Sequence, residues 1–147
     1  MILETITTPE DVKKLNIGQL ETLSDEIRER IVETVNENGG HLASNLGVAE
    51  IIVALYYCFD FPKDKLIFDV GHQCYAHKIL SGRNDRFPTI RKEGGLSGFP
   101  NRTESDFDAF GAGHAGNSVS ASLGYCAARD ALKEDYYVID LVGDASL

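Results

Sequence analysis

Hydrophobic residues recur every three to four positions in the first part of the chain, with charged residues between them. The series is Leu20, Leu23, Ile27, Ile31 and Val35. This spacing predicts an amphipathic helix, and Asn38-Gly39-Gly40 is typical of a helix end. Upstream, Thr8-Pro9-Glu10-Asp11 is typical of a helix start and predicts a short helix to about Leu15.

The remaining pattern predicts two strands among further helices. Residues 48–59 are nearly all apolar, with Glu50 as the exception, and are expected to form a buried helix. Strands are expected at 65–70 and 136–142, and helices at 73–81 and at 117–132, where a face of small residues suits close packing. Residues 91–113 are expected to form a long connection of the kind that is often functional or mobile. Its acidic residues Glu104, Asp106 and Asp108 are interpreted as a solvated run.

This order of elements predicts an α/β fold with a parallel sheet flanked by helices. Two strands are too few to complete such a sheet. The chain ends at Leu147, where the next helix is expected to begin. We therefore expect residues 1–147 to be part of an unfinished domain.

The net charge bears on which partners the chain can bind, and the cysteine content bears on the compartment in which it occurs. A net charge of −9 argues against nucleic acid, and the apolar runs are too short to cross a membrane. The first residues do not resemble a secretory signal. Cys58 and Cys126 lie in apolar helical patterns and are expected to be buried thiols, and the unpaired spacing of the cysteines favours the cytoplasm.

Three of the four histidines directly follow a glycine: His41, His72 and His114. Each pair stands at the boundary of an expected element. Ligands bind outside the carboxyl ends of the strands in open α/β sheets, so the three side chains are candidates for one cleft. The alternative is that each is a loop histidine with a satisfied hydrogen bond.

Two further stretches are candidates for phosphate and metal. The glycine-rich run from Gly111 to Ser118 opens a helix, whose free N–H groups favour an anion; the alternative is a tight helix entry without a ligand. Asp144 follows the second expected strand and is placed to hold Mg²⁺, or else to cap the next helix. A zinc site from His72, Cys74 and His77 has poor spacing, and His77 is more simply structural.

Taken together, these stretches resemble the 1-deoxy-D-xylulose-5-phosphate synthases, thiamine-diphosphate enzymes of the transketolase type. The resemblance runs from about Leu15 to Leu147. It is carried by residues 40–47, 68–73, 77–83, 94–100 and 104–105, and by Gly113-His114 and Gly143-Asp144.

The resemblance implies a thiamine-diphosphate-binding domain, of which residues 1–147 are the N-terminal part, and a role for each matching residue. His41 and His114 would be catalytic, and Asp144 would bind Mg²⁺. The cofactor would be contacted by His72, Gly113, His114, Ala115, Ser118, Ala145, Ser146 and Ser44. The implied reaction joins pyruvate, with loss of CO₂, to D-glyceraldehyde 3-phosphate, in a cytoplasmic homodimer.

The chain departs from the family pattern near the cofactor. Ala115-Gly116-Asn117 stands where Ser-Ser-Thr is usual, and Ala145 replaces the second glycine of the Gly-Asp-Gly motif. The asparagine that completes the metal motif and the glutamate that activates the cofactor would belong to the rest of the polypeptide, so residues 1–147 alone are expected to be inactive. A subunit of a split transketolase-like enzyme and a non-catalytic assembly module remain alternatives.

Overall fold

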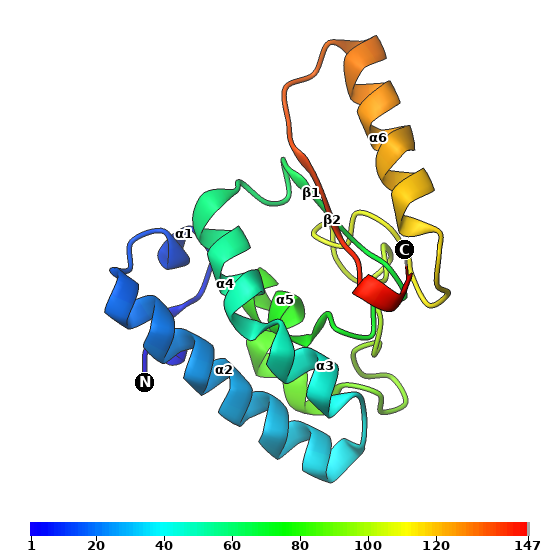
Figure 1. The fold of residues 1–147 in the computed structure, drawn as a ribbon. Helices are drawn as coiled ribbons and strands as arrows, with labels where there is room; N and C mark the ends of the chain where they lie inside the picture. Colours follow the sequence, from blue (N-terminus) through cyan, green and yellow to red (C-terminus); the bar gives the residue numbers. More distant parts are fainter. Residues whose placement is uncertain (147) are drawn as a thin grey trace. The chain divides into compact units, whose positions relative to one another are not determined.

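The computed structural model describes residues Met1–Ser146, which divide into two compact units. The first unit comprises Met1–Cys58 and His72–Gly98. The second comprises Phe59–Gly71 and the residues from Phe99 on. Figure 1 labels the helices and strands of both, and each unit is described by itself.

The first unit is helical. Its long helix α2 (Ile17–Asn38) begins at Asn16, whose side chain accepts the backbone N–H of Gln19, and ends at Gly39 with φ of 72°. The other elements are η1 (Leu3–Thr5), α1 (Pro9–Val12), α3 (Leu42–Gly47), α4 (Ala49–Cys58), α5 (Tyr75–Lys78), η2 (Ile79–Arg83) and η3 (Asn84–Thr89). Both predicted N-terminal helices are confirmed, although α1 ends at Val12 and not near Leu15.

The core of the first unit forms where α2 packs against α4. Leu23, Ile27 and Ile31 repeat every four residues along α2 and are fully buried, so they form one apolar stripe. On α4 the buried residues are Ala49, Ile52, Val53 and Tyr56. This i, i+3, i+4, i+7 spacing is one face of a helix.

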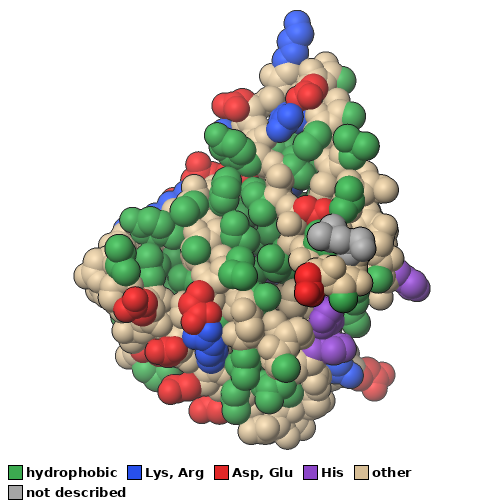
Figure 2. Space-filling model, viewed as in Figure 1, with side chains coloured by type: hydrophobic (Ala, Val, Ile, Leu, Met, Phe, Trp, Pro, Cys, Tyr) green, Lys and Arg blue, Asp and Glu red, His purple; other side chains and the backbone are tan. Residues whose placement is uncertain are grey.

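The expectation that the whole of residues 48–59 is buried was wrong. The opposite face of α4 is exposed, with Ile51 at 49% and Tyr57 at 44%. Cys58 lies on that exposed side, and Cys126 is partly exposed, so neither is the buried thiol that their apolar neighbourhoods suggested. Figure 2 shows that hydrophobic side chains, in green, are common on this face of the surface.

The predicted helix at 73–81 is broken into shorter pieces. Only Tyr75–Lys78 is α-helical, and the chain continues through the π-helical segment η2 and the 3₁₀ helix η3. Gly82, with φ of 80°, interrupts η2. The sequence pattern predicted that these residues are helical, but not that the α-helix gives way to π-helical and 3₁₀ hydrogen bonding.

The second unit contains a two-stranded parallel sheet. Strand β1 (Lys65–Phe68) pairs with β2 (Val138–Leu141), with Lys65 opposite Val138 and Phe68 opposite Leu141. Helix α6 (Ser118–Leu132) packs against both strands, and the short turn η4 (Asp144–Ser146) follows β2 (Figure 1). The predicted α/β class with a parallel sheet is confirmed.

Burial in the second unit is uneven. β1 is buried at Leu66, Ile67 and Phe68, whereas every residue of β2 is only half-buried. Of the small-residue face expected on α6, only Ser118 is fully buried. The acidic run in the long connection is not all solvated, because Asp108 is buried and accepts the backbone N–H of Asn101 at 2.8 Å.

Candidate functional site

The histidines His41 and His72 lie together in the first unit. Their ring centroids are 5.1 Å apart and their planes are inclined at 61°, an edge-to-face arrangement. His41 immediately precedes α3, and His72 follows the Gly71 turn after β1. Two of the three histidines predicted to share a cleft are therefore neighbours. His114 belongs to the second unit, and its place in a shared cleft stays a prediction.

The glycine before each of these three histidines adopts a positive φ: 142° at Gly40, 85° at Gly71 and 150° at Gly113. At Gly40, a Cβ would come within 2.6 Å of the Tyr75 hydroxyl oxygen. At Gly71, it would come within 2.5 Å of Pro100 Cδ. The repeated Gly-His pattern therefore has a backbone cause, since a side chain would be strained or would clash at these turns.

Burial and the neighbouring His41 both lower the pKa of His72 below the ordinary 6.5, His41 by charge repulsion, and so favour its neutral form. His72 Nδ1 is buried and makes no hydrogen bond within Met1–Ser146. A neutral imidazole with an unused buried nitrogen fits hydrogen bonding to a ligand or transfer of a proton.

Ser44 and Asn45 lie on α3, the helix that His41 begins. Ser44 is half-buried. Asn45 is fully buried, and its side chain donates to the backbone carbonyls of His41 and His72. The sequence analysis did not single out Asn45, although a polar residue four positions after His41 on a helix is the available signal.

In the second unit, the glycine-rich loop before α6 is held by Asp69. The carboxylate accepts the backbone N–H of Gly116 at 2.8 Å and, more weakly, that of Ser118 at 3.4 Å. Asn117, which directly precedes α6, provides no side-chain cap of its own. Asp69 therefore caps the helix from a distant point in the sequence.

This arrangement modifies the predicted anion site. Some of the N–H groups expected to face a phosphate are used by a carboxylate of the same chain, namely those of Gly116 and Ser118. Gly113, His114 and Ala115 are exposed earlier in the loop. The part of the loop that fits an external anion therefore lies before Gly116.

Two buried or partly buried carboxyl groups in this unit have opposite pKa shifts. Burial alone would raise the pKa of Asp69, but hydrogen bonds from the N–H groups of Gly116 and Ser118 outweigh it, so the pKa is lowered. Burial raises the pKa of Asp140, and the charge of Asp69 raises it further, against the opposing effect of Ser118 and Ser122. The sequence analysis singled out neither residue.

Asp144 lies where the sequence placed it, at the carboxyl end of β2. It begins the turn η4, is exposed, and accepts the backbone N–H of Ala145 at 2.9 Å. Ala145 and Ser146 complete the same turn. An exposed carboxylate at this place fits one ligand of a Mg²⁺ ion. No group of three His, Cys, Asp or Glu residues suited to a metal occurs within Met1–Ser146.

Comparison with known proteins decides the family. A family model described as 1-deoxy-D-xylulose-5-phosphate synthase matches residues 3–147. The chain belongs to this family. It is 56% identical over 99% of its length to "1-deoxy-D-xylulose-5-phosphate synthase" of Dehalococcoides mccartyi, and covers 23% of that protein. It is 51% identical over its whole length to the protein of the same name from Thermus thermophilus, and covers 24% of it.

This member of the synthase family spans about a quarter of the length of the curated relatives it matches. A third relative, from Carboxydothermus hydrogenoformans, is 55% identical over 99% of the chain, which covers 24% of that protein. The resemblance seen in the motifs is confirmed by these matches, which extend over nearly every residue.

The contacts of Cys74 and His77 do not support the alternative of a zinc site formed by His72, Cys74 and His77. The buried His77 Nδ1 lies 2.8 Å from the Tyr56 hydroxyl. The Cys74 thiol is buried and donates to the Gly98 carbonyl at 3.7 Å. Both side chains therefore serve the packing of the first unit, as expected for His77.

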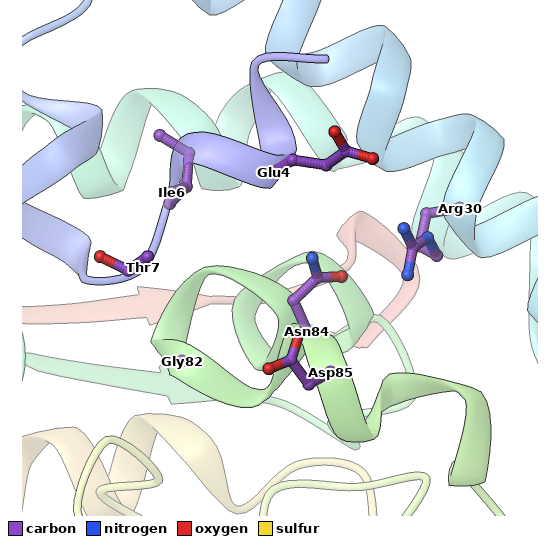
Figure 3. Close-up of a pocket in the computed structure, with 7 residues that line it drawn as sticks. All are labelled: Glu4, Ile6, Thr7, Arg30, Gly82, Asn84 and Asp85. Carbon is purple, nitrogen blue, oxygen red and sulfur yellow. The ribbon is translucent and has the colours of Figure 1, made fainter.

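A polar cavity of about 450 Å³ lies elsewhere in the first unit (Figure 3). Arg30 and the carboxylates of Glu4 and Asp85 line it, so its charges are of both signs. The other lining residues are Ile6, Thr7, Gly82 and Asn84. The residues predicted to bind cofactor or metal, or to be catalytic, do not line this cavity.

No helix within Met1–Ser146 has the length and apolar character needed to cross a membrane.

Proposed function

We propose that this chain is the N-terminal part of the diphosphate-binding domain of a synthase that makes 1-deoxy-D-xylulose 5-phosphate. The enzyme would condense pyruvate, with loss of CO₂, and D-glyceraldehyde 3-phosphate. The observation that carries this proposal is the match of residues 3–147 to the synthase family, together with relatives of that name at 51–56% identity. Supporting it, the motif histidines His41 and His72 are neighbours.

Thiamine diphosphate is the proposed cofactor, and when bound it supplies the nucleophilic carbon on which decarboxylation of a 2-oxo acid depends. We assign His72 and Ser44 of the first unit to its binding. From the second unit we assign Gly113, His114, Ala115, Ser118, Ala145 and Ser146. Ser118 is the least accessible of these, since it is fully buried at the start of α6.

His41 and His114 are the proposed catalytic residues. Each would hold or move a proton at an imidazole nitrogen, or donate a hydrogen bond to a substrate oxygen. Both side chains are exposed, as a group that meets substrate must be before binding. His72 is better suited to a neutral hydrogen-bonding role, because burial and His41 lower its pKa.

Asp144 is the proposed Mg²⁺ ligand. Its carboxylate is exposed directly after β2, and Mg²⁺ prefers oxygen ligands, with several waters and substrate phosphates completing its shell. The remaining protein ligands would come from the rest of the polypeptide. A homodimer and a cytoplasmic location are also proposed, the latter supported by three cysteines that form no disulfide.

The test is cofactor binding and turnover in the complete protein that carries this chain. Wild type is expected to form 1-deoxy-D-xylulose 5-phosphate from the two substrates. Asp144→Asn is expected to weaken thiamine-diphosphate binding in the presence of Mg²⁺ by at least about tenfold, the usual scale for disturbing a metal site.

Asp135→Asn is the matched control. Asp135 is exposed and lies three residues before β2, as Asp144 lies three residues after it. The control is expected to bind the cofactor as wild type does. Absence of product from wild type would contradict the proposed reaction, and unchanged cofactor binding in Asp144→Asn would contradict the metal assignment.

A further inference from the structure

Asn45 is a buried amide that joins three backbone groups of the first unit, two of which, those of His72 and Tyr75, lie far from it in the sequence. Its Nδ2 donates to the carbonyl of His41 at 2.6 Å and to the carbonyl of His72 at 2.8 Å. Its Oδ1 accepts the backbone N–H of Tyr75 at 2.9 Å. The side chain is fully buried, so water does not compete for these hydrogen bonds.

The three contacts use both N–H donors and the carbonyl oxygen of the amide. An Asn side chain has two N–H donors and one carbonyl acceptor. Here each donor meets a carbonyl and the acceptor meets an N–H group. The opposite orientation of the amide would place oxygen against two carbonyl oxygens, so the partners define one orientation.

The two carbonyls belong to the residues whose imidazoles form the edge-to-face pair. His41 precedes α3, and His72 lies beyond β1 in the sequence, so chain continuity does not hold them together. His72 Nδ1 makes no hydrogen bond within Met1–Ser146 that would orient its ring. The Asn45 amide links the backbones that carry the two rings, whose centroids are 5.1 Å apart.

We propose that Asn45 is a positioning residue, which sets the spacing and orientation of the His41 and His72 side chains by tying their carbonyls to one amide. This inference rests on the proposed function for its catalytic consequence. Asn45 touches neither cofactor nor substrate in this proposal, and acts only through the two histidines.

The simpler alternative is that Asn45 is a core amide that contributes stability alone. The chain offers a matched control in Asn38, whose Nδ2 also donates to two backbone carbonyls, those of Pro88 at 2.9 Å and Ile90 at 3.1 Å. Asn38 is partly buried and joins the end of α2 to the segment around η3, with no histidine among these partners. Loss of either amide should destabilise the first unit, whereas only loss of Asn45 should alter the histidines.

The primary test measures deuterium exchange at the imidazole C2 position of His41 and His72, by peptide mass spectrometry over a range of pH in the complete protein. This exchange reports the pKa of each histidine and needs no turnover. In wild type, the pKa of His72 is expected below 6.5. In Asn45→Ala it is expected to rise toward that value, because the ring becomes hydrated and separates from His41.

Asn38→Ala is expected to leave the pKa of His72 at the wild-type value. Two results would overturn the proposal: an unchanged pKa of His72 in folded Asn45→Ala, or an equal rise in Asn38→Ala. Asn45→Ser provides a milder variant. Its hydroxyl can donate to the carbonyl four residues earlier, that of His41, and it should release His72, with the same direction of shift.

His41→Gln keeps the proposal testable where neither Asn45 variant folds. If the amide holds the two rings in contact, removing the His41 charge should raise the pKa of His72. No change in this variant would show that the rings are not held together, and would overturn the proposal.

A kinetic measurement separates this inference from the proposed function. Asn45→Ala is expected to lower kcat on the order of 10²-fold, the scale of misplacing a catalytic group by about 1 Å, while Asn38→Ala of similar stability has a much smaller effect. Equal losses of kcat would contradict positioning. An inactive wild-type protein would contradict the proposed function, yet the exchange experiment would still decide the role of Asn45.

Discussion

The carboxylate of Asp69 accepts the backbone N–H of Gly116 at 2.8 Å, so an acidic side chain after β1 holds the loop that leads into α6. The contact spans 47 residues of sequence. The same carboxylate accepts the backbone N–H of Ser118, the first residue of α6, at 3.4 Å, and so provides the helix start with a cap that the Asn117 side chain does not supply. It also confines any external anion to the part of the loop before Gly116.

Asp69→Asn should change how stability depends on pH. The pKa of Asp69 is lowered in the folded chain, so its contribution is fully present above the unfolded value of 3.8 and is lost as pH falls through the folded pKa. The variant should be less stable than wild type near pH 7, and the difference should shrink in acid. Urea unfolding at several pH values measures this, with exposed Asp106→Asn as the control. A pH-independent difference would argue against the carboxylate contact.

Asp140→Asn should have the opposite effect on stability. Burial and Asp69 raise the pKa of Asp140, so its ionised form destabilises the fold above the folded pKa, and this cost disappears below the unfolded value of 3.8. We expect the variant to be more stable than wild type at pH 7, and this difference to disappear in acid. Urea unfolding at pH 7 and in acid, beside Asp135→Asn, tests this. A loss of stability at pH 7 would mean that the ionised carboxyl is favourably paired.

Tyr56→Phe should destabilise the first unit by about 1–2 kcal/mol, because it removes the hydroxyl that contacts buried His77 Nδ1 at 2.8 Å. The adjacent Tyr57→Phe is the control on the same helix, since Tyr57 is 44% exposed. Chemical denaturation of the two variants compares their free energies of unfolding. Equal values for both variants would show that the buried hydroxyl contributes nothing specific.

Gly71→Ala should be much more damaging than Gly82→Ala, although the two glycines have similar φ values of 85° and 80°. A Cβ at Gly71 would meet Pro100 Cδ at 2.5 Å and Ala112 Cβ at 2.9 Å, whereas at Gly82 its nearest neighbour would be Thr7 O at 3.9 Å. We expect losses of roughly 2–4 kcal/mol and about 1 kcal/mol, respectively, since the first adds overpacking to backbone strain. Thermal unfolding compares them, and similar melting temperatures would exclude the clash.

The sequence predicted only those residues of the site that are marked by a pattern among neighbouring residues. The Gly-His pairs were visible because a glycine before a boundary histidine is a feature of adjacent residues, and all three glycines have positive φ. Asn45 and Asp69 were missed because their partners lie up to 30 and 49 residues away. No periodic pattern encodes such a contact.

The sequence by itself determined the long helix α2, the helix α6, the two strands and the family. These depend on repeating apolar positions, on caps close in sequence and on motifs that can be read in order. Only the tertiary structure decided that Cys58 faces outward, that α5 ends after one turn, and that Asp69 caps α6. The physical reason is that burial and buried hydrogen bonds depend on which distant segments pack together, which local preference does not specify.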